Sequence, residues 1–240
     1  MWARPICPKQ IMESVWEYRI LLLEGTAVTI QLALGSLLLS VILGLIGALA
    51  KLSSNVVSQK LAASYTTLIR GVPDLVLMML LFYGGQQIVN DFGSFTGLWG
   101  YLEINQLTAG ITSIGFVFGA YMTETFRGAI LAIPRGQIEA GISCGMIPRT
   151  IFYRITWPQM VRHALPSFTN NWLVLLKATA LVSVIGLHDL VWNASTAGRS
   201  VREPFTFMFA VLIIYLLLTA TSDIGLRWLE RKYSLRAREV

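Results

Sequence analysis

The feature that most constrains this fold is a long run of residues without charge. The stretch Gly25–Ala50 contains no Asp, Glu, Lys or Arg and lies between Glu24 and Lys51. At 1.5 Å per residue, a helix over these 26 residues is long enough to cross a hydrocarbon layer of about 30 Å. Only 13% of the 240 residues are charged, against about 25% in an ordinary soluble domain. We therefore predict an all-α integral membrane protein.

Four further apolar stretches raise the predicted number of transmembrane helices to about five. They are approximately Leu61–Asn90, Gln106–Ile130, Ala164–Leu187 and Pro204–Ser222. The first of these stretches contains Gly71-Val72-Pro73. Because proline has no N–H group and disfavours the helical conformation of the residue before it, we expect a break or a kink there.

Lys and Arg residues outside the spans are shared unevenly between the two sides of the membrane. Eleven lie on one side and five on the other. Because short cytoplasmic loops collect Lys and Arg, we predict an N-terminus outside and a C-terminus in the cytoplasm. The predicted domains are an extracytoplasmic segment 1–24, a transmembrane domain 25–226 and a basic cytoplasmic tail 227–240. The net charge of +6 then reflects topology and contact with anionic lipid, not binding of nucleic acid.

The cytoplasmic loop between the third and fourth spans, about 134–160, contains a short predicted helix over Gln137–Cys144. Glu139 lies near its start, where a carboxylate suits the helix dipole and is placed to meet a basic residue of a partner. Ala140, Gly141 and Gly145 are small, and positions 141 and 145 share one helical face. We predict that this face lets a partner's backbone approach closely.

This loop resembles the cytoplasmic signature of permease subunits of ABC-type importers. That signature is Glu-Ala-Ala, three residues, Gly, and about nine residues later an Ile-x-Leu-Pro ending. The positions that match are Glu139, Ala140, Gly145, Ile155 and Pro158. The chain departs from the signature at Gly141, where the family prefers Ala, and at Trp157, where it prefers Leu. The resemblance implies a single permease domain with a coupling helix between spans three and four, in which Glu139, Ala140, Gly141 and Gly145 couple to an ATPase.

Three other stretches are similar to the polar amino acid branch of the same family. They are residues 66–76, 119–129 and 177–186. The Gly-Val-Pro-Asp form of the first is most like permeases for histidine, lysine, arginine and ornithine, or for the opines octopine and nopaline. The resemblance implies a multi-pass protein of the bacterial inner membrane that translocates such substrates.

The resemblance also implies partners. They are a homologous sister permease, a dimer of ATP-binding subunits, a periplasmic substrate-binding protein and the lipid bilayer. The chain contains no Gly-x-x-x-x-Gly-Lys-[Ser/Thr] loop, so we do not expect it to be an enzyme. ATP and Mg are expected on the partner ATPase, and no cofactor, metal or catalytic residue is predicted here.

Polar groups inside the spans supply the candidate substrate site, because ionisable residues in a membrane are costly and usually functional. A helix that restarts after Pro73 leaves unpaired N–H groups for the α-carboxylate of an amino acid. Asp74 and Glu124 then favour a cationic group. The predicted substrate-binding residues are Gly71, Val72, Pro73, Asp74, Tyr121, Glu124, Asn170 and Asn171.

Three intramembrane cations are predicted to be structural: Arg70, Arg127 and Lys177. Arg127 follows Glu124 by three residues, so the two side chains share one helical face and can neutralise each other. The alternative is that Glu124 binds a cationic substrate. For Lys177 we expect a structural ion pair. Two alternatives for the whole chain are an ion-coupled secondary amino acid carrier and a membrane enzyme, and neither accounts for the signature of the coupling loop.

Overall fold

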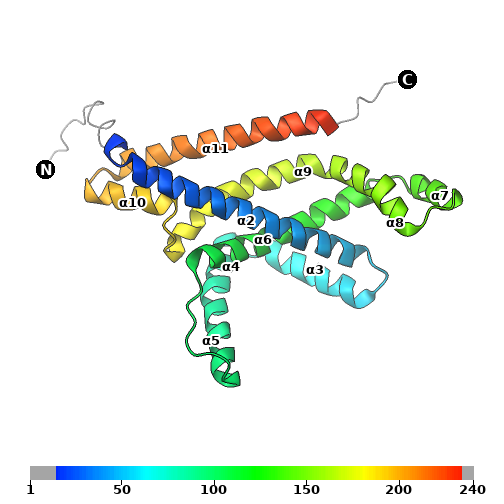
Figure 1. Cartoon of the computed structure of the whole chain (residues 1–240), viewed down its shortest axis with the longest axis horizontal. Coiled ribbons are helices and arrows are strands. Elements are labelled where there is room, and N and C mark those ends of the chain that lie inside the picture. The colour runs from blue at the N-terminus through cyan, green and yellow to red at the C-terminus, as the bar shows by residue number, and fades with distance from the viewer. Residues whose placement is uncertain (1–14, 234–240) are drawn as a thin grey trace.

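The computed structural model describes residues 15–233, and no strand occurs in that range, as predicted for an all-α protein. Figure 1 shows the arrangement of its helices. The helices are α2 (Arg19–Leu52), α3 (Val56–Arg70), α4 (Asp74–Met79), α5 (Gly85–Thr96), α6 (Gln106–Leu131), α7 (Arg135–Ser143), α8 (Pro148–Ile151), α9 (Trp157–Ala178), α10 (Leu190–Ser200) and α11 (Pro204–Tyr233). Short π-helical turns, η1 (Leu80–Gly84) and η2 (Phe152–Thr156), and a 3₁₀ stretch, η3 (Thr179–Ile185), continue some of them.

The core of the molecule is the contact between α2 and α6. Glycines of α2 allow the two backbones to approach closely, as small residues do in other membrane bundles. A methyl group on Gly44 would overlap Met122, and one on Gly47 would overlap Thr123. Around this contact, buried side chains mainly of α2, α6, α9 and η3 form an apolar cluster that includes Phe118.

Three helical segments are long and apolar enough to cross a membrane: Arg19–Leu52, Pro148–Ile185 and Pro204–Tyr233. A bent pair, Val56–Arg70 with Asp74–Thr96, would add a fourth. The helix α6, which matches the predicted third span, has 26 residues but is not among them. The protein therefore has several spans, while the count of five stays a prediction.

The break predicted at Gly71-Val72-Pro73 is present. Pro73 has an extended ψ of 134°, and the helix resumes at Asp74. The two halves are bent by 113° at this break, and a single crossing over Leu61–Asn90 stays a prediction. As a result α4 and α5 project away from the long axis of the bundle (Figure 1).

The long helices run between two opposite ends of the molecule (Figure 1). At the end that carries α10, Asn193 Nδ2 donates to the carbonyl of Leu21 at 2.9 Å and ties α10 to α2. The other end carries α7 and α8. We call these the α10 end and the α7 end. Helices continue beyond the predicted domain boundaries at 24 and 226, and the segments 1–14 and 234–240 of the predicted terminal domains lie outside the described residues.

Candidate functional site

A polar cleft of about 510 Å³ opens where α3, α6 and α9 meet. The helix α3 contributes its last residue, and α6 and α9 each contribute one face with helical spacing. The lining residues are Arg70, Tyr121, Glu124, Thr125, Pro166, Ser167, Asn170 and Asn171. Its volume falls within the range of about 300–1,000 Å³ that is usual for small-molecule sites.

Among residues 15–233, Glu124 is the only carboxylate that lines this cleft, and two cations contact it. Lys51 Nζ forms an ion pair with Glu124 Oε1, and Arg127 Nη1 lies 3.5 Å from Glu124 Oε2. Of the two alternatives left open by the sequence, the contact of Glu124 with Arg127 is present in the structure, and the role of Glu124 towards a substrate stays a prediction. Lys51 also donates to Thr66 Oγ1 at 2.6 Å, so this cluster joins α2, α3 and α6.

The sequence analysis missed Lys51, which it counted as a residue of a cytoplasmic loop. A usable signal was present, because the first and third predicted spans run in the same direction. Their last turns therefore lie at the same level of the membrane. A cation that ends one span and a carboxylate near the end of the other are then placed to meet.

Arg70 stands on a wall of the cleft beside an aromatic ring. Its Cζ lies 5.6 Å from the centre of the Tyr121 ring, which is a cation–π distance. Within residues 15–233 no carboxylate lies within 4.0 Å of Arg70. The guanidinium is exposed in the cleft and can bind an anionic group.

The wall opposite α6 is formed by amides and hydroxyls of α9. Asn171 Nδ2 donates to Thr125 Oγ1 at 2.9 Å, which connects α9 to α6. Asn170 is exposed and lines the cleft with Ser167. Asn171 therefore takes part in a contact between helices, and Asn170 is open to a ligand, while the predicted role of both in substrate binding stays a prediction.

The structure divides the predicted substrate-binding residues into two groups. Tyr121, Glu124, Asn170 and Asn171 line the cleft, whereas Gly71, Val72, Pro73 and Asp74 do not. Asp74 borders a separate cavity of about 10 Å³, which is no larger than the space for one water molecule. It also occupies the first turn of α4, where its carboxylate competes with any other anion for the start of that helix.

The ion pair expected for Lys177 is not found among the described residues. Its side chain is exposed on the outer side of α9, so α9 does not direct it towards the carboxylates of the other helices. The ion pair of Lys177 therefore stays a prediction, because the sequence gives the depth of a residue along a span but not the direction in which it points.

The predicted coupling helix exists as α7, but its glycines have other roles than expected. Gly141 is the only buried residue of α7 and faces Ile151 and Ile155, because the chain folds back over α7 through α8 and η2. Gly145 has a φ of 74° and ends the helix in a left-handed conformation, a common place for glycine. Only Glu139 and Ala140 of the four predicted coupling residues lie on an exposed helical face.

Comparison with known proteins identifies the family. The family described as "binding-protein-dependent transport system inner membrane component" matches residues 36–235. The chain belongs to this family. As an inner membrane component of such a transport system, it is a multi-pass protein of the inner membrane, and an ion-coupled secondary carrier is set aside.

Individual members of the family are similar over nearly the whole chain. The histidine/lysine/arginine/ornithine transport system permease protein HisQ of Escherichia coli is 50% identical over 214 residues, covering 89% of this chain and 93% of the relative. The octopine transport system permease protein OccQ of Rhizobium radiobacter is 39% identical over 207 residues, covering 86% of each. A crystal structure of an amino acid ABC transporter with histidines has a TM-score of 0.79 and 32% identity, covering 91% of this chain and 97% of the other.

Proposed function

We propose that this inner membrane component is a permease subunit of an ATP-driven importer of basic amino acids or opines, and that the polar cleft binds the substrate. The observation that carries the proposal is a guanidinium, Arg70, and a carboxylate, Glu124, in one cleft between membrane helices. Every amino acid brings a carboxylate, and a basic one brings two cationic groups. The names of the similar permeases support this class of substrate.

In this proposal Arg70 binds the α-carboxylate, because a guanidinium offers paired N–H donors that match a carboxylate. Glu124 attracts a cationic group of the substrate, and Asn170 and Ser167 supply further hydrogen bonds. Glu124 already has Lys51 and Arg127 as partners, so it contributes only weak attraction. Weak attraction suits a transporter, which must release what it binds, and leaves most of the selectivity to a periplasmic binding protein.

We infer that the open side of the cleft faces a sister permease subunit. Arg70 and Asn170 are exposed in the isolated chain, although they belong to helices at membrane depth. Charged and amide groups in contact with lipid are costly, so a second protein surface or a water-filled path is the favourable neighbour. A translocation path between two permease chains provides both.

Energy from ATP is proposed to enter at the α7 end, which we place in the cytoplasm. A dimer of ATP-binding subunits, carrying ATP and Mg, would dock against Glu139 and Ala140. Gln159 Nε2 donates to Gln137 Oε1 at 2.5 Å, which links α7 to the start of α9. Since α9 also carries Asn170 and Asn171, one helix connects the docking region with the cleft.

The test is uptake of labelled arginine into proteoliposomes that contain the purified complex, with binding protein outside and ATP inside. Excess histidine, lysine or octopine should reduce the uptake, and glutamine should not. Replacement Arg70→Gln should lower uptake at least tenfold with normal assembly, whereas Arg199→Gln, an exposed cation on α10, should leave it unchanged. Uptake that persists in Arg70→Gln would contradict the assigned site, and uptake without ATP would contradict the proposed importer.

A further inference from the structure

The helix α11 has fully buried residues only near its beginning, and its last turns contact α9 through hydrogen bonds from Thr169 and Arg162. Its buried residues are Thr206, Phe207 and Val211, all within the first eight positions of a 30-residue helix. Beyond them α11 runs along α9 towards the α7 end (Figure 1). The space under this part of α11 is therefore open to further apolar groups.

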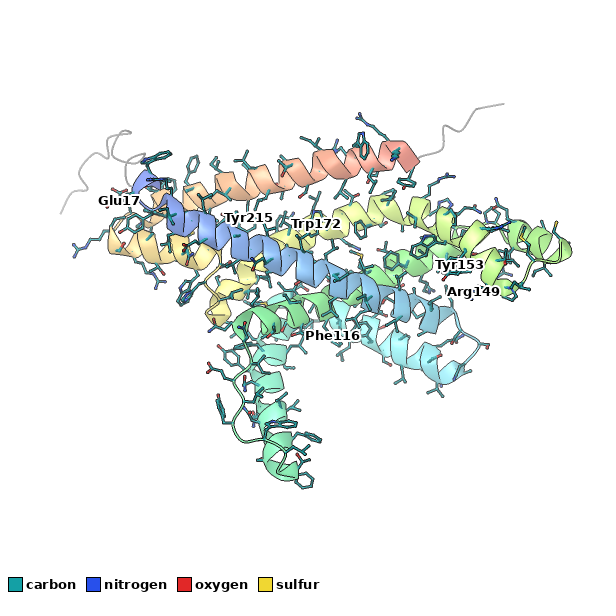
Figure 2. The ribbon with its side chains drawn as sticks, viewed as in Figure 1. Glu17, Phe116, Arg149, Tyr153, Trp172 and Tyr215 are labelled. Atoms are coloured by element: carbon teal, nitrogen blue, oxygen red, sulfur yellow. The ribbon has the colours of Figure 1, made fainter. Side chains whose placement is uncertain are left out.

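Two apolar grooves follow one another along this part of α11. The first, about 220 Å³, is lined by Leu34, Leu37, Phe168, Trp172, Gly225 and their neighbours on α11. Trp172 lies on the side of α9 that faces α11 (Figure 2). The second, about 230 Å³, is nearer the α7 end, includes Phe168 and Leu229, and has no polar side chain among its lining residues.

The position and length of the two grooves fit one leaflet of a bilayer. On α2 their lining extends from Leu34 to Leu45, which is about 16 Å of helix at 1.5 Å per residue. Half of a hydrocarbon core of about 30 Å is about 15 Å. Lys51, six residues beyond Leu45, marks the polar boundary of α2.

Cations gather where the second groove ends. Arg162 is adjacent to Val161, which lines that groove, and its Nε donates to the carbonyl of Tyr233 at 2.8 Å. Over Arg162 and the last eleven residues of α11 the cations are Arg162, Arg227, Arg231 and Lys232, and the carboxylates are Asp223 and Glu230. Four cations against two carboxylates leave this end with an excess positive charge of two.

Both carboxylates already have partners. Asp223 Oδ2 accepts from Arg227 Nε at 2.8 Å, and Glu230 Oε1 accepts from Thr169 Oγ1 at 2.6 Å. Lys232 is exposed, with its Nζ 5.3 Å from the centre of the Trp228 ring. Arg162, which follows the groove residue Val161, and the exposed Lys232 at the end of α11 are the cations that we consider for an anionic group at this end.

We propose that the two grooves bind one acyl chain of an anionic phospholipid, whose headgroup is held by Arg162 and Lys232. The apolar lining selects a hydrocarbon chain, and the excess of positive charge selects an anionic headgroup over a zwitterionic one. The lipid fills the space under α11 between its buried beginning and the contacts of its last turns with α9. This site is separate from the polar cleft and does not depend on which substrate is carried.

Native mass spectrometry of the purified importer complex tests the site. Delipidated complex is incubated with phosphatidylglycerol or with phosphatidylethanolamine of the same chain length. The proposal predicts about one retained phosphatidylglycerol per copy of this chain and at least fivefold less phosphatidylethanolamine. Equal retention of the two lipids, or retention of neither, would overturn it.

Two substitutions and two matched controls locate the lipid. Ala164→Phe fills the second groove, and Arg162→Gln removes the headgroup cation, so each should lower retention of phosphatidylglycerol at least fivefold. Leu217→Phe, on an exposed position of α11, and Lys60→Gln, on an exposed position of α3, should retain it. If Ala164→Phe prevents assembly of the complex, the test rests on Arg162→Gln. Unchanged retention of phosphatidylglycerol by Arg162→Gln would contradict the site. A photocrosslinker at Leu229 that captures a polypeptide instead of lipid would assign the groove to a protein segment.

Discussion

Lys51 is the residue on which the cluster around Glu124 depends. It forms an ion pair with Glu124 and donates to Thr66, while Arg127 reaches the same carboxylate at 3.5 Å. The Lys51 side chain is 13% exposed and that of Glu124 is 25% exposed, so solvent screens this contact only in part. The loss of one partner from such a pair is costly because it leaves the other charge poorly compensated.

The replacement Lys51→Met is expected to lower stability by about 1–3 kcal/mol, less than the 3–5 kcal/mol typical of fully buried pairs. Thermal unfolding of the complex in detergent measures the change. The double replacement Lys51→Met with Glu124→Gln should recover most of the loss, since no uncompensated charge remains. If the double variant loses as much stability as the two single variants added together, the ion pair is not the source of the loss.

Asp189 is a buried acid that lies between the segment Pro148–Ile185 and α10. Its Oδ1 accepts from the backbone N–H of Trp192 at 2.9 Å, while Oδ2 has no partner within the described residues. Burial raises the pKa of Asp189 from 3.8 to about 6. Because the native state then binds the proton more tightly than the unfolded state, stability falls as the pH rises from about 4 to about 6 and is level above that.

The replacement Asp189→Asn removes this pH dependence. We expect it to stabilise the protein by about 1–3 kcal/mol at pH 8, where a charged carboxylate is replaced by a neutral amide, and to have little effect at pH 4. Thermal unfolding at the two pH values provides the comparison. Glu103→Gln, at an exposed position, is the control. If Asp189→Asn changes the melting temperature equally at both pH values, the charge of Asp189 is not the cause of the change in stability.

At the scale of helices, the close packing of α2 on α6 depends on glycines. Gly47→Val should destabilise the complex by about 1–3 kcal/mol, because the new side chain overlaps Thr123 and forces the helices apart. Gly128→Ala, a glycine of α6 with open space around its Cα, is the control and should be neutral or slightly stabilising. Equal melting temperatures for Gly47→Val and the unchanged protein would contradict the importance of this contact.

The breaks after α3 and after α7 have different causes. The turn at 71–73 follows from Pro73, which ends α3 and starts a new helix at 113° to it. Gly145 ends α7 by adopting a positive φ, and the N–H of Met146 then bonds to the carbonyl of Gly141 at 3.0 Å. The first break places Arg70 at the end of α3 and on the rim of the cleft, while the second shapes the exposed end of α7.

At the scale of the whole molecule, the proposed path from the ATPase to the cleft runs from α7 along α9. Glu139→Lys reverses the charge on the exposed face of α7 and should lower ATP-driven uptake at least tenfold. Binding of substrate to the isolated complex should not change, because Glu139 does not line the cleft. Arg149→Gln, an exposed neighbour in α8, is the matched control. Normal ATP-driven uptake by the Glu139→Lys variant would show that Glu139 does not couple the ATPase to transport.

The sequence by itself determined the class of the fold and most of its elements. Long runs without charge are explained only by lipid as the solvent, and the break at Pro73 follows from the missing N–H of proline. The pair of Glu124 and Arg127 follows from their spacing on one helix. The spacing of Glu139, Gly145 and Pro158 indicated the family. All of these are local features, read from residues close together in the chain.

The tertiary structure alone decided which of these residues meet. Lys51 reaches Glu124 across 73 positions, Gly141 turns towards Ile151 and Ile155, and Lys177 points outwards. Whether two residues on different helices touch depends on the rotation of each helix and on the register between them. Those two quantities are set by side-chain packing over the whole interface, such as the contact between α2 and α6. Periodicity along one helix therefore shows which residues share a face, but only the packed molecule shows what that face contacts.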